Sequence, residues 1–117
     1  MKATNLRVAF GSMFLVAVLA VAGCASVQIG TDFDLPTFVA KVQRGTTTKA
    51  AVKGWLGEPV SRGVEVDAQG RKFDQWTYYL GTGHAPSFQD TQFKNLQVKF
   101  DEHGVVQAYS WSGEMKK

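Results

Sequence analysis

The chain passes through three hydrophobic patterns between its first residue and its last. Residues 8–22 form an uncharged, mostly apolar run. Apolar residues then recur at the three- and four-residue spacing of a helix as far as Leu56. From Val60 to Trp111, apolar and polar residues alternate with a period of two, which is typical of half-buried strands. These patterns predict an N-terminal apolar segment, then two helices, then a sheet.

Two short helices are predicted from their capping residues. The first begins at Asp34, whose side chain can cap free backbone N–H groups, and ends at Gly45. The second begins at Thr47 or Thr48 and ends at Gly57, because a glycine followed closely by a proline stops a helix. Neither helix is long enough to be stable alone, so each is expected to pack on a sheet.

The alternating half of the chain predicts three or four strands in an antiparallel meander. The longest irregular stretch, Gly81–Gln92, is predicted as a loop that is either functional or a plain surface insertion. Helices grouped before strands favour an α+β fold, with two short N-terminal helices packed on a three- to four-stranded antiparallel sheet. The expected strands cover residues 60–66, 72–80, 93–101 and 105–111, with turns at 67–70 and 101–104.

The last predicted strand carries the best candidate contact surface. A period of two puts Tyr109 and Trp111 on one side of this strand, opposite Val106 and Ala108. If the aromatic side is exposed, it is a candidate partner surface. If the aromatic side is buried, the two smaller residues face solvent, which they tolerate.

Other apolar and aromatic positions are interpreted in two ways. His84 and Phe88 lie in the predicted loop and are further candidates for contact with a partner. Val52, Trp55 and Leu56 fall at helical spacing in the second helix, so they are interpreted as core residues that pack on the sheet.

Cys24 is the only cysteine, and it follows the apolar run directly after Ala22 and Gly23. Small residues at these two positions suit a signal peptidase. The ending resembles the bacterial lipobox, in which the cysteine sulfur receives a diacylglycerol and the new amino group is acylated. We therefore expect a signal peptide over residues 1–23 and a lipidated tether over residues 24–34. The alternatives are an ordinary secreted protein and a membrane-spanning helix, although such helices usually need about 20 apolar residues.

The charge pattern argues against nucleic acid as a partner. The full chain has a formal net charge of +3, but Lys2 and Arg7 lie in the segment predicted to be removed, so the rest is almost neutral. Its basic residues are interspersed with acidic ones and form no basic cluster. With Cys24 lipidated, no disulfide can form. The single domain predicted over residues 35–117 must then be held together by packing.

No residue pattern indicates catalysis, a metal or a cofactor. His84 and His103 lie in a predicted loop and turn without a second ligand at metal-binding spacing. Asp101 and Glu102 are adjacent and point apart in a turn, so they cannot act as a carboxylate pair. The serines lack a nucleophile-elbow context. The chain is therefore predicted to be a non-catalytic binding or scaffold protein with no small-molecule substrate.

A resemblance to a known family rests on residues 42–59 and the strands after them. Residues 42–59 combine a helix that ends in Gly-Thr, a capped second helix, and a Leu-Gly-X-Pro ending. The sequence Trp-Thr-Tyr-Tyr at 76–79 and a strand, Asp-Glu-His-Gly turn and strand follow. This combination resembles the SmpA/OmlA (BamE-like) family of small outer-membrane lipoproteins over roughly residues 35–111.

The resemblance implies a two-helix, antiparallel-sheet domain anchored in the outer membrane and facing the periplasm. Outer-membrane lipid, bound through the acyl chains of Cys24, and subunits of the barrel-assembly complex are the implied partners. Ala25 after the cysteine, in place of Asp, fits the sorting of such lipoproteins to the outer membrane. The implied function is a non-catalytic accessory subunit in the assembly of β-barrel outer-membrane proteins.

Two other functions are kept as alternatives. The OsmE-like branch shares the same domain at a similar size and implies a lipoprotein of the envelope-stress response. The helix-and-sheet architecture also resembles secreted β-lactamase inhibitor domains, which would imply an enzyme-inhibitor role on fold analogy alone.

Overall fold

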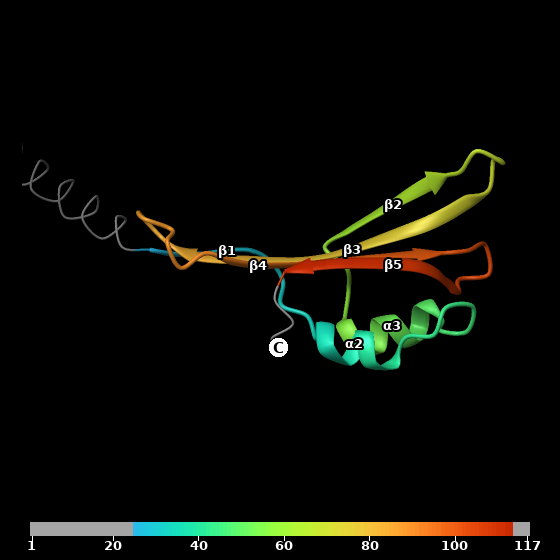
Figure 1. Ribbon diagram of the computed structural model, residues 1–117, viewed down its shortest axis with the longest axis horizontal. Helices are drawn as coiled ribbons and strands as arrows, with labels where there is room; N and C mark the ends of the chain where they lie inside the picture. Colours follow the sequence, from blue (N-terminus) through green and yellow to red (C-terminus); the bar gives the residue numbers. More distant parts are fainter. Residues whose placement is uncertain (1–24, 114–117) are drawn as a thin grey trace, which may run out of the picture. The chain divides into compact units, whose positions relative to one another are not determined.

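The computed structural model describes residues 25–113, which form an α+β fold with two helices and five strands (Figure 1). These residues belong to two units: 25–27 with 83–91, and 28–82 with 92–113. The elements are β1 (Ser26–Gly30), α2 (Leu35–Lys41), α3 (Lys49–Leu56), β2 (Ser61–Val66), β3 (Lys72–His84), β4 (Gln92–Phe100) and β5 (Val106–Gly113).

The strands form one antiparallel sheet in the order β1-β3-β4-β5, and β2 also pairs with β3. The sheet therefore has five strands, whereas the sequence predicted three to four. The additional strand is β1, which lies in the segment predicted to be a tether. Beyond the end of β1, the backbone N–H of Thr31 donates to the carbonyl of Tyr79 at 3.0 Å. Polar and apolar residues do alternate in β1, but the stretch has only five residues and all of its side chains are exposed, so the pattern is a weak strand signal.

The helix boundaries follow the capping residues at three of the four ends. Asp34 caps α2 and accepts from the backbone N–H of Thr37 at 3.2 Å. Thr48 caps α3, which ends before Gly57 as predicted. The prediction that the first helix ends at Gly45 is wrong, because α2 ends at Lys41. A turn replaces the expected last part of that helix, in which the Thr47 hydroxyl accepts from the backbone N–H of Gln43 at 2.8 Å.

Helices α2 and α3 lie on the same side of the sheet, and the core fills the space between these helices and the strands (Figure 1). The hydroxyl of Tyr78 crosses this layer and donates to the carbonyl of Gly57 at 2.9 Å. Burial raises the pKa of Tyr78 to about 12. The fully buried positions come from both helices and from strands β3, β4 and β5: Leu35, Phe38, Val52, Tyr78, Leu96, Val98, Phe100 and Val106.

A buried lysine fixes the segment between β1 and α2. Lys94 on β4 is only 5% exposed, and its Nζ donates to the carbonyl of Phe33 at 2.5 Å. Its Nζ also lies 2.7 Å from the carboxylate of Asp32, and this hydrogen bond lowers the pKa of Asp32. A buried ammonium needs such partners because its transfer from water is costly.

A β-bulge determines which side chains of β5 face the helices. Phe100 is opposite Val106, whereas the preceding residue of β4, Lys99, is opposite Ala108, so Gln107 is an extra residue in β5. Val106 is buried, and Tyr109 packs against the same core. The prediction that Val106 lies on the opposite side from Tyr109 is therefore wrong, because a period of two breaks at a bulge. Ala108 does lie on the opposite side, as predicted.

The predicted loop at 81–92 is shorter than expected. β3 continues to His84 and β4 begins at Gln92, so the turn between them covers only residues 85–91. Thr82 is still opposite Gln92 in the ladder. Glycines and polar residues weaken the strand signal here, but backbone pairing between two long strands extends the hairpin through them.

Candidate interaction surfaces

Tyr109 and Trp111 form an aromatic surface on β5, beside helix α2. Tyr109 is half-buried, and the edge of its ring meets Phe38 of α2 at a centroid distance of 5.3 Å and an angle of 88°. Trp111 stacks on Tyr109 at 6.0 Å and 17°, and it is 43% exposed. The structure therefore brings these two predicted residues together, with one ring fixed in the core and the other open to solvent.

Trp55 extends this surface onto α3. The sequence analysis interpreted Trp55 as core, but its side chain is only half-buried, whereas Val52 and Leu56 are buried. Its ring lies 6.4 Å from that of Phe38, and the ammonium of Lys41 lies 5.9 Å above it. Helical spacing indicates only the direction of a side chain, so it did not show that this one lies at the margin of the helix layer.

His84 and Phe88 lie in the other unit, around the turn between β3 and β4. His84 contacts Asp90 through its ring Nδ1, and its backbone N–H donates to the same carboxylate at 3.1 Å. The contact with the His84 ring is the main reason why the pKa of Asp90 is below its ordinary value. Phe88 is exposed and folds back beside Gly83. His84 therefore stabilises this turn, and Phe88 is the member of the pair that offers apolar area.

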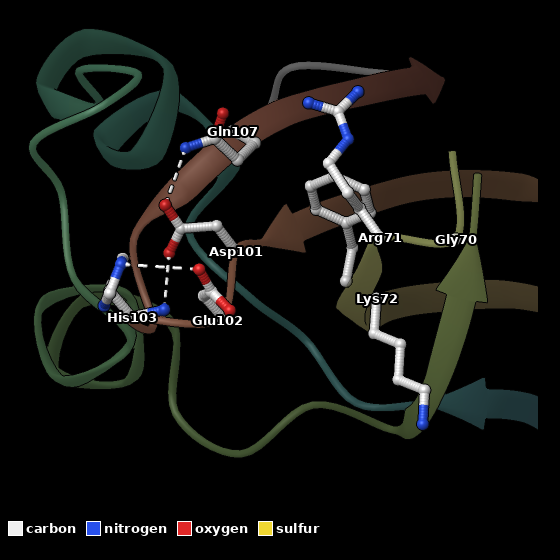
Figure 2. Close-up of a pocket in the computed structure, with 8 residues that line it drawn as sticks. Gly70, Arg71, Lys72, Asp101, Glu102, His103 and Gln107 are labelled. Atoms are coloured by element: carbon white, nitrogen blue, oxygen red, sulfur yellow. Dashed lines mark hydrogen bonds and ion pairs between the residues drawn. The ribbon is translucent and has the colours of Figure 1, made fainter. Parts of the chain in front are cut away.

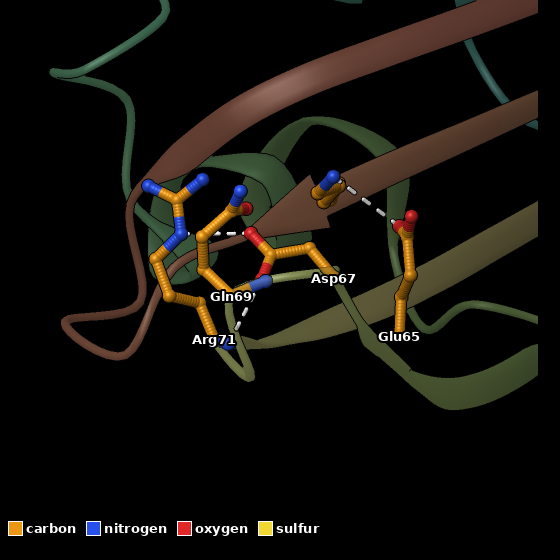
Figure 3. Close-up of polar contacts among 5 residues, drawn as sticks. Glu65, Asp67, Gln69 and Arg71 are labelled. Atoms are coloured by element: carbon orange, nitrogen blue, oxygen red, sulfur yellow. Dashed lines mark hydrogen bonds and ion pairs between the residues drawn. The ribbon is translucent and has the colours of Figure 1, made fainter.

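The β2–β3 and β4–β5 hairpins have turns of the same design. In the first, one carboxylate oxygen of Asp67 accepts from the backbone N–H groups of Gln69 and Arg71, both at 2.9 Å (Figure 3). In the second, one oxygen of Asp101 accepts from His103 and Val105 at 2.9 and 3.0 Å. In both turns, the aspartate at the first position accepts hydrogen bonds from backbone N–H groups that have no strand partner at the end of the ladder.

A pocket of about 660 Å³ lies between the two turns and is lined by residues 70–73, 101–103 and Gln107. Figure 2 shows the Asp101 carboxylate directed at Gln107 and at the backbone of His103. The ring Nε2 of His103 is 3.6 Å from the Glu102 carboxylate. Because its carboxylate already accepts these hydrogen bonds, Asp101 is a structural acceptor at this pocket.

Cys24, the predicted lipidation site, lies outside the described residues. Within them, no group of three or more His, Cys, Asp and Glu side chains is placed to hold a metal ion. None of the helices described is sufficiently long and apolar to cross a membrane.

Comparisons of the chain with protein-family models, with curated proteins and with solved structures found no match. The observations that bear on function are therefore the sequence motifs, the fold, and the two pairs of candidate contact residues. Of these pairs, Tyr109 and Trp111 join a rigid core position to an exposed one, which is the arrangement expected of a contact surface.

Proposed function

We propose that this protein is an outer-membrane lipoprotein, anchored through acyl chains on Cys24, whose periplasmic domain is a non-catalytic accessory subunit in the assembly of β-barrel outer-membrane proteins. The Ala22-Gly23-Cys24 sequence after an apolar run supports the anchor. Two capped helices on one face of an antiparallel sheet agree with the fold that the resemblance to the SmpA/OmlA (BamE-like) family implies.

The single observation that carries the scaffold role is the Tyr109–Trp111 stack. Tryptophan and tyrosine contribute much of the binding free energy at protein interfaces, because they bury large areas at little conformational cost. Phe38 of the core packs against Tyr109, and Tyr109 in turn stacks on Trp111 and orients it. A partner would therefore meet a preorganised aromatic surface, which reduces the entropy lost on binding.

The charged side chains support a contact made by apolar groups. Most of those in the described residues pair with one another, so few remain to attract a partner by charge. Pairs on the surface of the domain contribute little to binding or stability. The surface pairs are Lys49–Asp74, Lys53–Glu58, Arg62–Glu58, Arg71–Asp67 and Lys99–Glu65. In a further pair, Lys94–Asp32, the lysine is buried.

The proposal is tested by purifying the full chain from membranes and identifying the bound proteins by mass spectrometry. The native chain should recover subunits of the barrel-assembly machinery. Trp111→Ala should lower their recovery about tenfold, as expected for the loss of an interface tryptophan. Cys24→Ala should release the chain from the membrane and show how much of the binding depends on the anchor.

Phe93→Ala is the matched control, because Phe93 is 49% exposed and lies on the sheet face away from the helices. It removes a comparable exposed ring without touching the Tyr109–Trp111 stack, so recovery should be unchanged. A membrane-bound native chain that recovers none of the barrel-assembly subunits would contradict the scaffold role. Equal losses from Trp111→Ala and Phe93→Ala would show that the aromatic stack is not the contact.

A further inference from the structure

The outer edge of β5 is covered at its start and open beyond it. At the start, the backbone N–H of Val106 donates to the carbonyl of Thr47 and its carbonyl accepts from Gly45, both at 2.8 Å. From Ala108 to Gly113, β4 is the only strand partner among the described residues. Every second residue of an antiparallel strand directs its N–H and C=O away from its neighbour, so this edge presents backbone groups that can pair with another strand.

The open edge of β5 lacks the features that usually prevent strand addition. Charged residues, prolines and bulges protect the edges of natural sheets. The stretch Ala108–Gly113 has no charge and no proline, and the bulge at Gln107 comes before it. By contrast, β2 carries Arg62 and Glu65, both held in ion pairs.

Strand β1 is also uncharged but is a poorer template for pairing. It has five residues, and all of their side chains are exposed. β5 is fixed to the core at Val106 and Tyr109, so its edge is held in an extended conformation before any partner arrives. A preorganised strand loses less entropy when it pairs.

We propose that β5 pairs antiparallel with β5 of a second copy of this chain, with Ser110 at the two-fold axis. Residues at equal distances from Ser110 along this edge are alike: both neighbours are aromatic, and the next residue on each side is small. Tyr109 of one copy would lie opposite Trp111 of the other, and Ala108 would lie opposite Ser112. Cross-strand aromatic pairs are among the more favourable in sheets, and two small residues can approach closely.

The pairing joins two five-stranded sheets into one and brings the Tyr109 and Trp111 rings of both copies side by side on one sheet face, which extends the aromatic surface proposed to meet a partner. It also places the helix layers of both copies on the same side of the joined sheet, because Tyr109 and Trp111 of each copy face that side. A single strand pair buries less area than a standard interface, so the dimer is expected to be weak in dilute solution. High protein concentration or trapping by a covalent bond is needed to measure it.

Disulfide trapping tests the pairing and its centre. Ser110→Cys in the full chain carrying Cys24→Ala puts the two sulfurs across the proposed axis, whereas Ser61→Cys puts a thiol on the edge strand β2, on the same sheet face. Both serines are exposed. After oxidation at equal concentration, Ser110→Cys should give at least about fivefold more covalent dimer than Ser61→Cys. Equal yields would mean random collision and would overturn the proposal.

The register is tested with charges added to the Ser110→Cys chain. The double change Ala108→Lys with Ser112→Lys places one lysine opposite another at two positions across the axis. The repulsion should reduce the disulfide yield at least about fivefold. Ala108→Lys with Ser112→Glu sets opposite charges together and should restore the yield. Both positions are on the face away from the core, and melting curves verify that both variants fold. Equal yields from the two variants would overturn the Ser110-centred pairing.

Discussion

The two hairpin turns have the same backbone design but differ in what their aspartates hold. In both, the glycine at the fourth position donates its backbone N–H to the aspartate carbonyl at 3.0 Å. In the first turn, the second oxygen of Asp67 accepts from the Arg71 guanidinium at 2.7 Å, inside the turn itself. In the second, the corresponding oxygen of Asp101 accepts from the Gln107 side chain at 2.9 Å.

This difference connects a local turn with a distant surface. Gln107 is the extra residue of the bulge in β5, and the bulge sets which side of the sheet Tyr109 and Trp111 face. The turn at Asp67 therefore stabilises only its own hairpin. The turn at Asp101 also orients a strand, and with it the aromatic surface that supports the proposed function.

The largest effect should come from removing each aspartate in turn. Asp101→Ala should lower the melting temperature by about 10 °C, because two backbone N–H groups lose their acceptor and the bulge loses its anchor. Asp67→Ala should lower it less, since only the turn is affected. Near-ultraviolet circular dichroism, which reports the packing of aromatic rings, should change more with Asp101→Ala, because the bulge that it anchors orients Tyr109 and Trp111. A matching aromatic signal change in both variants would show that the bulge does not depend on Asp101.

The glycines should give smaller effects that are equal in the two turns. Gly70 and Gly104 have φ values of +78° and +74°, which side chains other than glycine rarely adopt. An added Cβ meets nothing within 4 Å at Gly70 and only the Lys49 side chain at 3.7 Å at Gly104, so the cost is conformational. Each change to alanine should cost about 1 kcal/mol, measured by urea unfolding. Asparagine at either position should cost less, and a much larger loss at one turn would refute their equivalence.

Features set by neighbouring residues could be predicted from the sequence. The caps at Asp34 and Thr48 and the helix end at Gly57 depend on side chains within one turn of the backbone they bind. The pairing of Tyr109 with Trp111 on one side of a strand also needed only local periodicity. The same periodicity failed at Gln107, because a bulge depends on the opposing strand and on a hydrogen bond that the Gln107 side chain donates to Asp101, six residues away.

Features set by distant contacts could not be predicted. Strand β1 forms where the second half of β3 offers a partner, and its own alternation covers only five residues, none of them buried. The partial exposure of Trp55 depends on where the helix layer ends. The buried position of Lys94 depends on the backbone carbonyl of Phe33, 61 residues earlier in the chain. A lysine in an alternating strand pattern is ordinarily assigned to the solvent side.

Acid should lower the stability that both turns contribute to the fold. Burial alone would raise the pKa of Asp67, but hydrogen bonds from Arg71 and Gln69 outweigh it and lower the pKa. The backbone N–H of Val105 is the main cause that lowers the pKa of Asp101. A pKa lowered by folding gives stability that is present above the unfolded value of 3.8 and lost as pH falls through the folded value.

Urea unfolding between pH 6 and about pH 2 measures this acid dependence. Asp67→Ala and Asp101→Ala should each show a shallower fall below about pH 4 than the native chain, because each lacks one carboxylate whose pKa folding lowers. Both variants should follow the native slope above pH 5, where these groups are ionised in the folded and unfolded states alike. A variant whose slope below pH 4 equals that of the native chain would show that its turn does not hold the carboxylate in the ionised form.

The smallest expected effect is a difference between the two turns in how their stability depends on salt. Arg71 is a charged, exposed partner, so Arg71→Gln should lower the melting temperature by less than about 2 °C, and the loss should be smaller at 1 M salt, which weakens ion pairs between exposed charges. Gln107 is neutral, so the loss caused by Gln107→Ala should be the same at low and high salt. Thermal melts of the two variants at both salt concentrations make the comparison. If both losses respond to salt alike, the charge of Arg71 is not what closes the first turn, and the two turns differ only in where their second hydrogen bond leads.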